Sequence, residues 1–166
     1  MAVPPAPPGT DAAPGSDPAL PPGAPDILHA SCVAHAGRAL LIAGPAGAGK
    51  SALAMEMIGL GARLVADDRT ALSRVGGALT AAPPAAIAGL IEVRGIGLLR
   101  LPFAEGVPVA GLIDLAAAEE ARLPPHRTTA LLGVSVTLFR RVAGAHVAAA
   151  LMACLAGART EPRPLR

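Results

Sequence analysis

Short apolar runs, separated by glycine, proline or charged residues, fill most of the chain, and this pattern is more typical of strands than of helices. The run Arg38–Ala43 is apolar at almost every position, as in a strand that is buried on both faces. Leu28–Ala34 predicts a strand before it, and Leu64–Ala66 predicts a strand after it. Between them, Ser51–Leu60 has apolar residues at helical spacing and a glycine directly after its last residue, which predicts a helix. The order of strand, loop, helix and strand is that of a βαβ unit, whose strands are normally parallel.

The second half of the chain predicts more strands and one more helix. Gly76-Gly77 separates two short apolar runs, at 70–72 and 78–81, which is a hairpin signal. The alanine-rich segment Val142–Leu155 predicts a closing helix. Further strands are predicted at Leu90–Val93, Leu98–Leu101, Val109–Leu115 and Val134–Leu138. We therefore expect an α/β domain with a mixed sheet and few helices.

The two ends of the chain differ in composition from its middle. Residues 1–25 are mostly Ala, Pro, Gly, Asp and Ser, and such a segment cannot bury enough apolar surface to offset its conformational entropy. We expect a disordered tail there, a second one at 159–166, and one folded domain over 26–158. The length of 166 residues fits one domain rather than two.

Composition narrows the possible partners and the compartment. The net charge is only +2, the arginines are scattered and aromatic residues are nearly absent, so we expect no nucleic-acid partner. No apolar segment is long enough to span a membrane, and the first residues lack the features of an export signal, so we expect a cytoplasmic protein without a membrane partner. Cys32 and Cys154 lie far apart without metal-ligand spacing, which favours two reduced thiols over a disulfide.

A glycine-rich loop follows the apolar strand Arg38–Ala43. Residues 44–51 read GPAGAGKS and match the phosphate-loop pattern G-x-x-x-x-G-K-[ST] in full, with a strand before and a helix after. Glycines let backbone N–H groups curl around phosphate oxygens, the helix directs the positive end of its dipole at them, and a loop serine ligates Mg²⁺. Chance is the alternative in a chain this rich in glycine. The residues expected to bind ATP are Gly44, Gly47, Ala48, Gly49, Lys50 and Ser51.

Two adjacent carboxylates follow the predicted strand Leu64–Ala66. Asp67 and Asp68 therefore sit at the carboxyl end of a strand near the loop, where ligands of α/β sheets bind. One carboxylate can act near the metal and the other near the attacking hydroxyl, and a carboxylate beside another can serve as a general base. The alternative is a solvated turn.

Four more polar residues are candidates for the site. Glu92 lies within an otherwise apolar predicted strand, where a charge is costly unless it is paired or metal-bound; the alternative is an edge strand. Asp114 is read as the N-cap of a following helix in preference to a site residue. His29 precedes the loop on a strand expected to neighbour the loop strand, and is either structural or an aid to phosphate chemistry. Arg122 either stabilises charge on a transferring phosphoryl group or is simply solvated.

With these residues in place, the chain resembles the catalytic domain of the HPr kinase/phosphorylase family. The resemblance runs from His29 to about Leu138 and rests on the loop at 44–51, the LVADDR stretch at 64–69, the IEVRGIG stretch at 91–97 and an arginine-leucine pair at 122–123. Glu-Val-Arg-Gly-x-Gly is the most specific of these strings. The family phosphorylates a serine of HPr, a small phosphocarrier protein, and can remove that phosphate by phosphorolysis.

The resemblance implies a fold, a partner and residue roles. The expected fold is a variant P-loop fold related to phosphoenolpyruvate carboxykinase, with HPr or an HPr-like phosphocarrier as protein substrate and hexamers among full-length relatives. Ser51 and Glu92 would hold Mg²⁺. Asp67 would act as the base toward the substrate serine, with Asp68 and His29 in support. Arg122 would engage the phosphate.

The chain also departs from the family pattern. The Pro-rich segment stands in place of the separate N-terminal domain of full-length members, so we expect the short, single-domain form. A Pro-Val-x-x-Gly-Arg-Asn segment is not recognisable, and residues 136–141 stand about where it would be. The C-terminal helical region is shortened. These departures count against the reverse reaction and against a hexamer.

Two other functions remain open on the sequence alone. A nucleotide sensor would bind ATP without catalysis and signal by partner contact, but it would have no need of Asp67, Asp68 and Glu92. A small-molecule kinase would need a lid and substrate-binding arginines on helices, and no lid is evident.

Overall fold

The structure is a computed structural model that describes residues 26–160. The predicted tail at 1–25, and residues 161–166 of the second predicted tail, lie outside the described residues. The strands are β1 (Asp26–Leu28), β2 (Ala30–His35), β3 (Arg38–Ala43), β4 (Arg63–Ala66), β5 (Thr70–Val75), β6 (Ala78–Ala82), β7 (Leu90–Val93), β8 (Gly97–Arg100), β9 (Val107–Ala118), β10 (Thr128–Leu131) and β11 (Val134–Arg141). The helices are α1 (Lys50–Gly59), the short 3-10 helix η1 (Ala85–Ile87) and α2 (Val147–Leu155).

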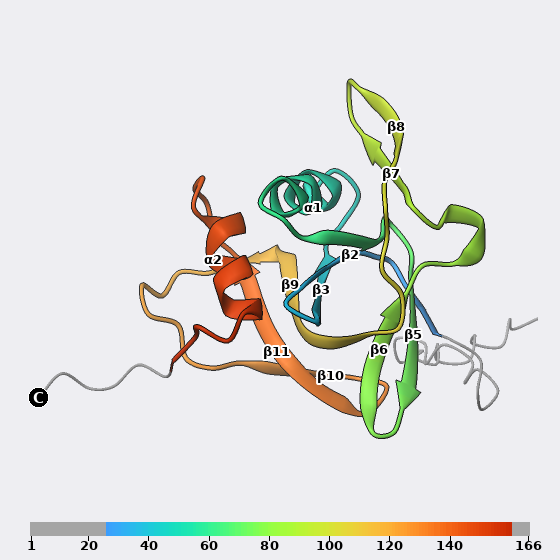
Figure 1. Cartoon of the computed structure of the whole chain (residues 1–166). Helices are drawn as coiled ribbons and strands as arrows, with labels where there is room; N and C mark the ends of the chain where they lie inside the picture. The colour runs from blue at the N-terminus through green and yellow to red at the C-terminus, as the bar shows by residue number, and fades with distance from the viewer. Residues whose placement is uncertain (1–25, 161–166) are drawn as a thin grey trace, which may run out of the picture.

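A single curled sheet forms the body of the described part, and the β7–β8 hairpin projects from it (Figure 1). The strands follow the order β1-β5-β6-β9-β3-β2-β4, and β11 joins through β9 with β10 on its far side. Strand β9 is long enough to pair with β6 at its start and then with β3 and β11, both of which are parallel to it. The mixed sheet with few helices is the α/β architecture that the sequence predicts. Within residues 26–160 no helix is both long and apolar enough to cross a bilayer.

The predicted βαβ unit of β3, α1 and β4 forms, but its two strands are not neighbours. Strand β2 lies between them and pairs antiparallel with both. β3 and β4 therefore run in the same direction, as expected, with one strand inserted. Ala30 pairs with Ala43 and Cys32 pairs with Ala66, so the start of β2 meets the ends of β3 and β4 at one edge of the sheet.

Both faces of β3 are buried, which explains its continuous apolar sequence. Leu40 and Ile42 face a core that includes Met57 of α1 and Leu151 of α2. Side chains alternate across a strand, so Leu41 faces a second core on the opposite side, formed with residues of β5, β6 and β11. Cys32 is buried in this second core and carries a free thiol, whose pKa is raised by burial, and Cys154 on α2 is also free.

Several element boundaries differ from the prediction. The first predicted strand is divided, because the chain bends at His29 between β1 and β2. Helix α2 begins at Val147 rather than at 142, since Gly144 has a φ of +132°, which a right-handed helix excludes. β10 was not predicted at all; it pairs with β11 through a tight turn in which Leu132 and Gly133 both have positive φ.

The interpretation of Asp114 as a helix N-cap is wrong. Asp114 lies inside β9, which continues to Ala118, and the next element is the strand β10. Its Oδ1 accepts a hydrogen bond of 2.9 Å from the N–H of Ala116, two residues on. Asp114 is in register with Ala43, the last residue of β3.

The connection between β9 and β10 is held by Glu119. Its carboxylate accepts the N–H of Ala121 and pairs with Arg127, and the N–H of Glu119 itself donates to the carbonyl of Arg141. The hydrogen bond from Ala121, together with Arg127, lowers the pKa of Glu119 below its ordinary value of 4.5.

Glu119→Gln is expected to lower the urea midpoint of unfolding at neutral pH. A carboxyl whose pKa is lowered by folding stabilises the protein above its unfolded pKa, and this contribution is lost as the pH falls through the folded value. The difference between variant and wild type should therefore shrink at pH values well below 4.5. Glu120→Gln, at the exposed neighbouring position, is the control, and an equal midpoint shift in both variants would contradict the role of the Glu119 pair.

Candidate active site

The loop between β3 and α1 adopts backbone conformations that favour glycine. Gly47 and Gly49 have φ values of +79° and +96°, and a Cβ at either position would meet nothing within 4 Å. Glycine is therefore favoured at these positions by the backbone conformation and not by close packing. At Gly44, by contrast, a Cβ would lie 3.0 Å from Cβ of Leu115 and 3.2 Å from Cβ of Ala48. The loop is therefore closely packed where it leaves β3 and open where it enters α1.

The N-terminus of α1 is suited to an anion. Its N-cap is Gly49, which has no side chain to satisfy the first N–H groups, and its first turn contains no acidic residue. The positive end of the helix dipole is thus not neutralised locally. Phosphate groups bind at helix N-termini of this kind.

Lys50 lies across the loop with its ammonium group near loop carbonyls. Its side chain is buried, with 7% of the residue exposed, and Nζ donates to the carbonyl oxygens of Gly44 at 3.0 Å and of Pro45 at 3.3 Å. Both acceptors are neutral. An ammonium group in this position can exchange them for phosphate oxygens, which are charged and form stronger hydrogen bonds.

Asp67 is the buried centre of the site. It is 8% exposed, and its Oδ1 accepts hydrogen bonds of 2.7 Å from the hydroxyls of both Ser31 and Ser51. Its Oδ2 accepts the N–H of Glu92 at 3.1 Å. The donors come from β2, α1 and β7, so this carboxylate connects the loop helix to two strands.

Asp68 faces the solvent and pairs with His29. Nε2 of His29 lies 2.6 Å from Oδ1 of Asp68, and both side chains are well exposed. Asp68 has a φ of +64°, a conformation uncommon for any residue other than glycine, and the turn is closed by a hydrogen bond from the N–H of Arg69 to the carbonyl of Asp67. The two adjacent aspartates therefore point into different environments, one buried and one accessible.

Glu92 reaches the site through its backbone. Its N–H donates to Oδ2 of Asp67, while its side chain is exposed close to the turn of the β7–β8 hairpin. Pairing of Glu92 with Leu98 fixes its place on that hairpin. Glu92 is therefore tied to the site by its backbone, and its exposed carboxylate is open to a ligand.

The oxygen atoms of this site fit a magnesium-nucleotide. Mg²⁺ prefers oxygen ligands and usually takes only one or two from the protein, with the rest from water and phosphate. Ser51 and Glu92 would supply a hydroxyl and a carboxylate, and the hydroxyl of Ser51 is held by Asp67. Among residues 26–160 no group of three or more His, Cys, Asp or Glu side chains could hold a metal ion alone. A Mg²⁺ ion held by Ser51 and Glu92 would take its remaining oxygen ligands from water and a polyphosphate.

Arg122 is the one predicted site residue that the structure does not bring to this cluster. It is exposed in the connection between β9 and β10, and it makes no hydrogen bond or ion pair with the described part of the chain.

Ser31 is a site residue that the sequence analysis did not identify. A serine inside an apolar strand was the available signal, but its two acidic contacts lie 36 and 37 positions away.

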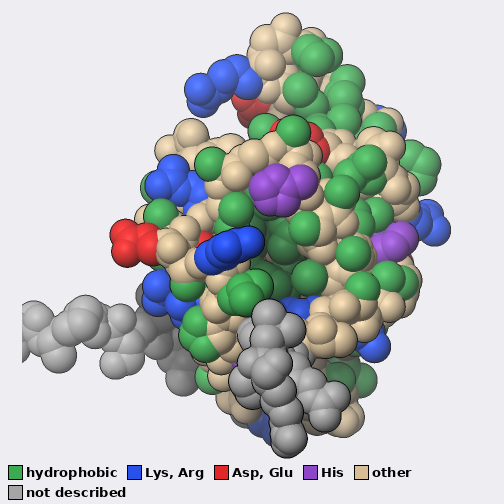
Figure 2. Space-filling model, turned by 90° about the vertical axis from the view of Figure 1, so that its left-hand side faces the viewer, with side chains coloured by type: hydrophobic (Ala, Val, Ile, Leu, Met, Phe, Trp, Pro, Cys, Tyr) green, Lys and Arg blue, Asp and Glu red, His purple; other side chains and the backbone are tan. Residues whose placement is uncertain are grey.

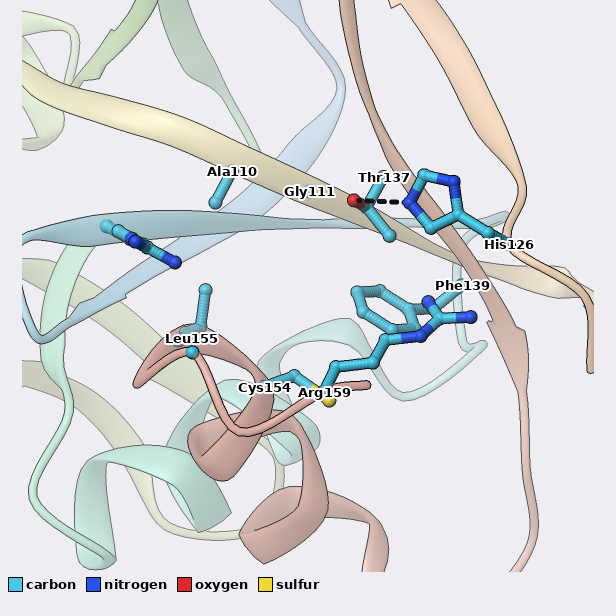
Figure 3. A pocket seen from close by; sticks show the side chains of 10 residues that line it. Ala110, Gly111, His126, Thr137, Phe139, Cys154, Leu155 and Arg159 are labelled. Carbon is cyan, nitrogen blue, oxygen red and sulfur yellow. Dashed lines mark hydrogen bonds between the residues drawn. The ribbon is translucent and has the colours of Figure 1, made fainter. Parts of the chain in front are cut away.

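A cavity of about 290 Å³ lies away from the loop (Figure 3). It is lined by residues at the starts of β3 and β9, on β11 and at the end of α2. Arg159 lies over the ring of Phe139, with 5.3 Å between the guanidinium carbon and the ring centroid, and Thr137 is hydrogen-bonded to His126. Arg38 opens β3 and the loop follows its other end, so the cavity and the loop lie at opposite ends of this strand.

On the face of the molecule seen from the α2 side, charged side chains form separate spots among apolar ones (Figure 2).

Comparisons with known proteins agree with the geometry. The family described as HPr Serine kinase C-terminal domain matches residues 24–111, which include the loop, both aspartates and Glu92. Curated relatives named HPr kinase/phosphorylase are 40% identical over 80 residues in Clostridium tetani, covering 48% of this chain and 26% of the relative, and 35% identical over 99 residues in Clostridium beijerinckii, covering 60% and 31%. The chain thus spans between a quarter and a third of the length of these relatives.

A solved structure extends the likeness beyond the matched segment. The Hpr(Ser) kinase/phosphatase from Coxiella burnetii superposes with a TM-score of 0.68 at 25% sequence identity, over 80% of this chain and 89% of that one. The likeness therefore includes strands that follow residue 111, where the family match ends. Because the family match covers more than half of the 166 residues, the chain belongs to the HPr serine kinase C-terminal domain family.

Proposed function

We propose that this protein is an ATP-dependent protein serine kinase whose substrate is HPr or an HPr-like phosphocarrier. The observation that carries the proposal is the contact between Ser51 of the loop and the buried Asp67, next to the accessible pair of Asp68 and His29. It supports a proton acceptor next to a loop that would bind the triphosphate. The names of the relatives supply the identity of the protein substrate.

The loop and its neighbours would hold the nucleotide. Lys50 exchanges its two loop carbonyls for phosphate oxygens, and the N–H groups at the start of α1 bind the same phosphates. Ser51 and Glu92 would hold Mg²⁺, with Asp67 fixing the hydroxyl of Ser51. When bound, the metal neutralises charge that develops on the phosphates.

The transfer itself moves one phosphoryl group and one proton. The substrate serine oxygen forms a bond to the γ-phosphorus while the bond from that phosphorus to the β–γ bridging oxygen breaks, leaving ADP. The serine proton passes to a carboxylate. Positioning and electrostatic stabilisation provide most of the rate in such reactions, since the chemistry needs little covalent help from the protein.

We assign the proton to Asp68 rather than to Asp67, the base that the family resemblance implies. Asp67 is buried and already accepts three hydrogen bonds, so its geometry suits the orientation of Ser51. Asp68 is exposed to an incoming protein side chain, and His29 beside it holds its carboxylate in place. A base must lie within reach of the proton that it accepts, and only an accessible group meets that requirement.

Further parts of the proposal come from the family resemblance. Arg122 remains the residue predicted to engage the phosphate, and its exposure leaves it free to do so. A cytoplasmic location remains an expectation from the sequence. The family resemblance also predicts self-assembly and the reverse, phosphorolytic reaction.

The test is direct. Purified protein is incubated with Mg²⁺, γ-labelled ATP and purified HPr, and the label on HPr is measured. The matched control is HPr in which the acceptor serine is replaced by alanine. Label on the wild-type carrier alone supports the proposal. A protein that binds ATP but labels neither carrier would contradict it and would favour a nucleotide sensor.

A further inference from the structure

One hydroxyl connects the two acidic residues of the site. Oγ of Ser31 donates to Oδ1 of Asp67 at 2.7 Å and accepts the N–H of Asp68 at 3.3 Å. Ser31 is 0% exposed, so water does not compete for either bond. We propose that Ser31 is a positioning residue that holds both aspartates in their working geometry, a role that rests on the proposed kinase function.

The first effect of Ser31 is on Asp67. This carboxylate accepts donors from three separate elements, and two of them, Ser31 and Ser51, share one oxygen. The bond from Ser31 fixes the side-chain torsion that keeps this oxygen facing α1. Without that bond Asp67 gains freedom to rotate, and Ser51 loses a defined partner. The hydroxyl of Ser51 is the loop group that we expect to meet the metal, so its orientation depends on a residue of β2.

The second effect is on the turn that presents Asp68. A non-glycine residue with a φ of +64° is strained and persists only where the surroundings determine it. Asp68 is the central residue of this turn, and its N–H donates to the hydroxyl of Ser31. The same turn places the Asp68 carboxylate against His29, two positions before Ser31. Ser31 and His29 thus hold one residue by its backbone and by its side chain.

Both effects need a group that donates and accepts at once. A hydroxyl does so, because it has one O–H donor and two acceptor lone pairs. Alanine provides neither function, and threonine provides both with one added methyl group. This difference gives the proposal a conservative variant.

Ser31→Ala is expected to reduce kcat for phosphoryl transfer about 10-fold or more, the range found when groups that orient site residues are removed. KM for ATP should change less than kcat, because Asp67 is still present to accept the hydroxyl of Ser51 and Lys50 is unchanged. The N–H of Asp68 should exchange with deuterium faster than in the wild type, because its acceptor is gone. Ser31→Thr should retain most of the turnover and the slow exchange.

The control is Thr70→Val, which also removes a fully buried hydroxyl. Oγ1 of Thr70 donates to the carbonyl of Ala30 and touches neither aspartate. Thr70→Val therefore distinguishes a fall in turnover caused by lower stability from one caused by misplaced aspartates. Equal turnover in Ser31→Ala and wild type would overturn the proposal, and so would equal losses in Ser31→Ala and Thr70→Val. If Ser31→Thr does not fold, the comparison of the other two variants decides.

The exchange measurement also separates this proposal from the kinase assignment. If wild-type protein transfers no phosphate to HPr, the proposed function fails, but faster exchange at Asp68 in Ser31→Ala still supports the positioning of the turn. Unchanged exchange at Asp68 would overturn the positioning role even in an active kinase.

Discussion

Lys50→Ala is expected to weaken MgATP binding by about 10- to 100-fold, since a hydrogen bond to a charged group contributes about 1.5–3 kcal/mol. Lys50 carries the positive charge at the centre of the loop, and its present partners are the neutral carbonyls of Gly44 and Pro45. Loss of the ammonium group leaves the phosphates with the backbone N–H groups and the metal. Isothermal titration calorimetry with a non-hydrolysable ATP analogue and Mg²⁺ measures the change.

Arg63→Ala is the control for the loss of one positive charge. Arg63 is exposed at the start of β4 and donates to the carbonyl of Phe103, at the opposite end of that strand from Asp67. It should leave the affinity for MgATP close to that of the wild type. Equal affinities for the wild type and Lys50→Ala would mean that the loop does not bind the triphosphate, and the proposed function would then lose its basis.

Asp68→Asn is expected to reduce transfer to HPr by about 10²- to 10⁴-fold, the usual contribution of a general base, with little change in MgATP affinity. An amide keeps the size of the side chain but cannot accept the serine proton. Asp67→Asn should behave differently. It disturbs the orientation of Ser51, so both turnover and MgATP affinity should fall. Single-turnover transfer and calorimetry on the two variants give the comparison.

The opposite pattern would restore the role first predicted for Asp67. If Asp67→Asn stops transfer at unchanged MgATP affinity while Asp68→Asn remains active, the buried carboxylate is the base. Glu56→Gln, at an exposed position on α1, removes a charge without touching the cluster and should match the wild type in both measurements.

Local sequence signals predicted the parts of the site that recur at fixed spacing. The loop with Lys50 and Ser51 is a contiguous motif between a strand and a helix, and Asp67 and Asp68 follow a strand end directly. Ser31 has no such signal. Its function depends on a pairing between β2 and β4 that brings together residues 36 positions apart, and only the folded chain shows this.

The fold shows the same division between local and distant signals. The apolar run of β3, the helical spacing of α1 and the glycine pair between β5 and β6 each reflect interactions within a few residues, and each predicted its element correctly. The sequence analysis predicted that the strand before the loop neighbours β3, and it does. The full order of strands depends on contacts between distant segments, so the position of β2 between β3 and β4 was not predicted. Strand β10 was missed because its sequence TTAL, with exposed and half-buried positions in alternation, contains no apolar run, and its partner is set by the turn at Leu132 and Gly133.

The inserted strand has a consequence for where site residues can arise. In a fully parallel arrangement only chain segments leaving the strands would face the nucleotide. Because β2 runs against β3 and β4, the chain enters β2 at that same rim, and its first residues become available there. His29 and Ser31 occupy this entry point. Substitutions that change the orientation of the two aspartates can therefore occur before the loop in the sequence, outside the glycine-rich motif.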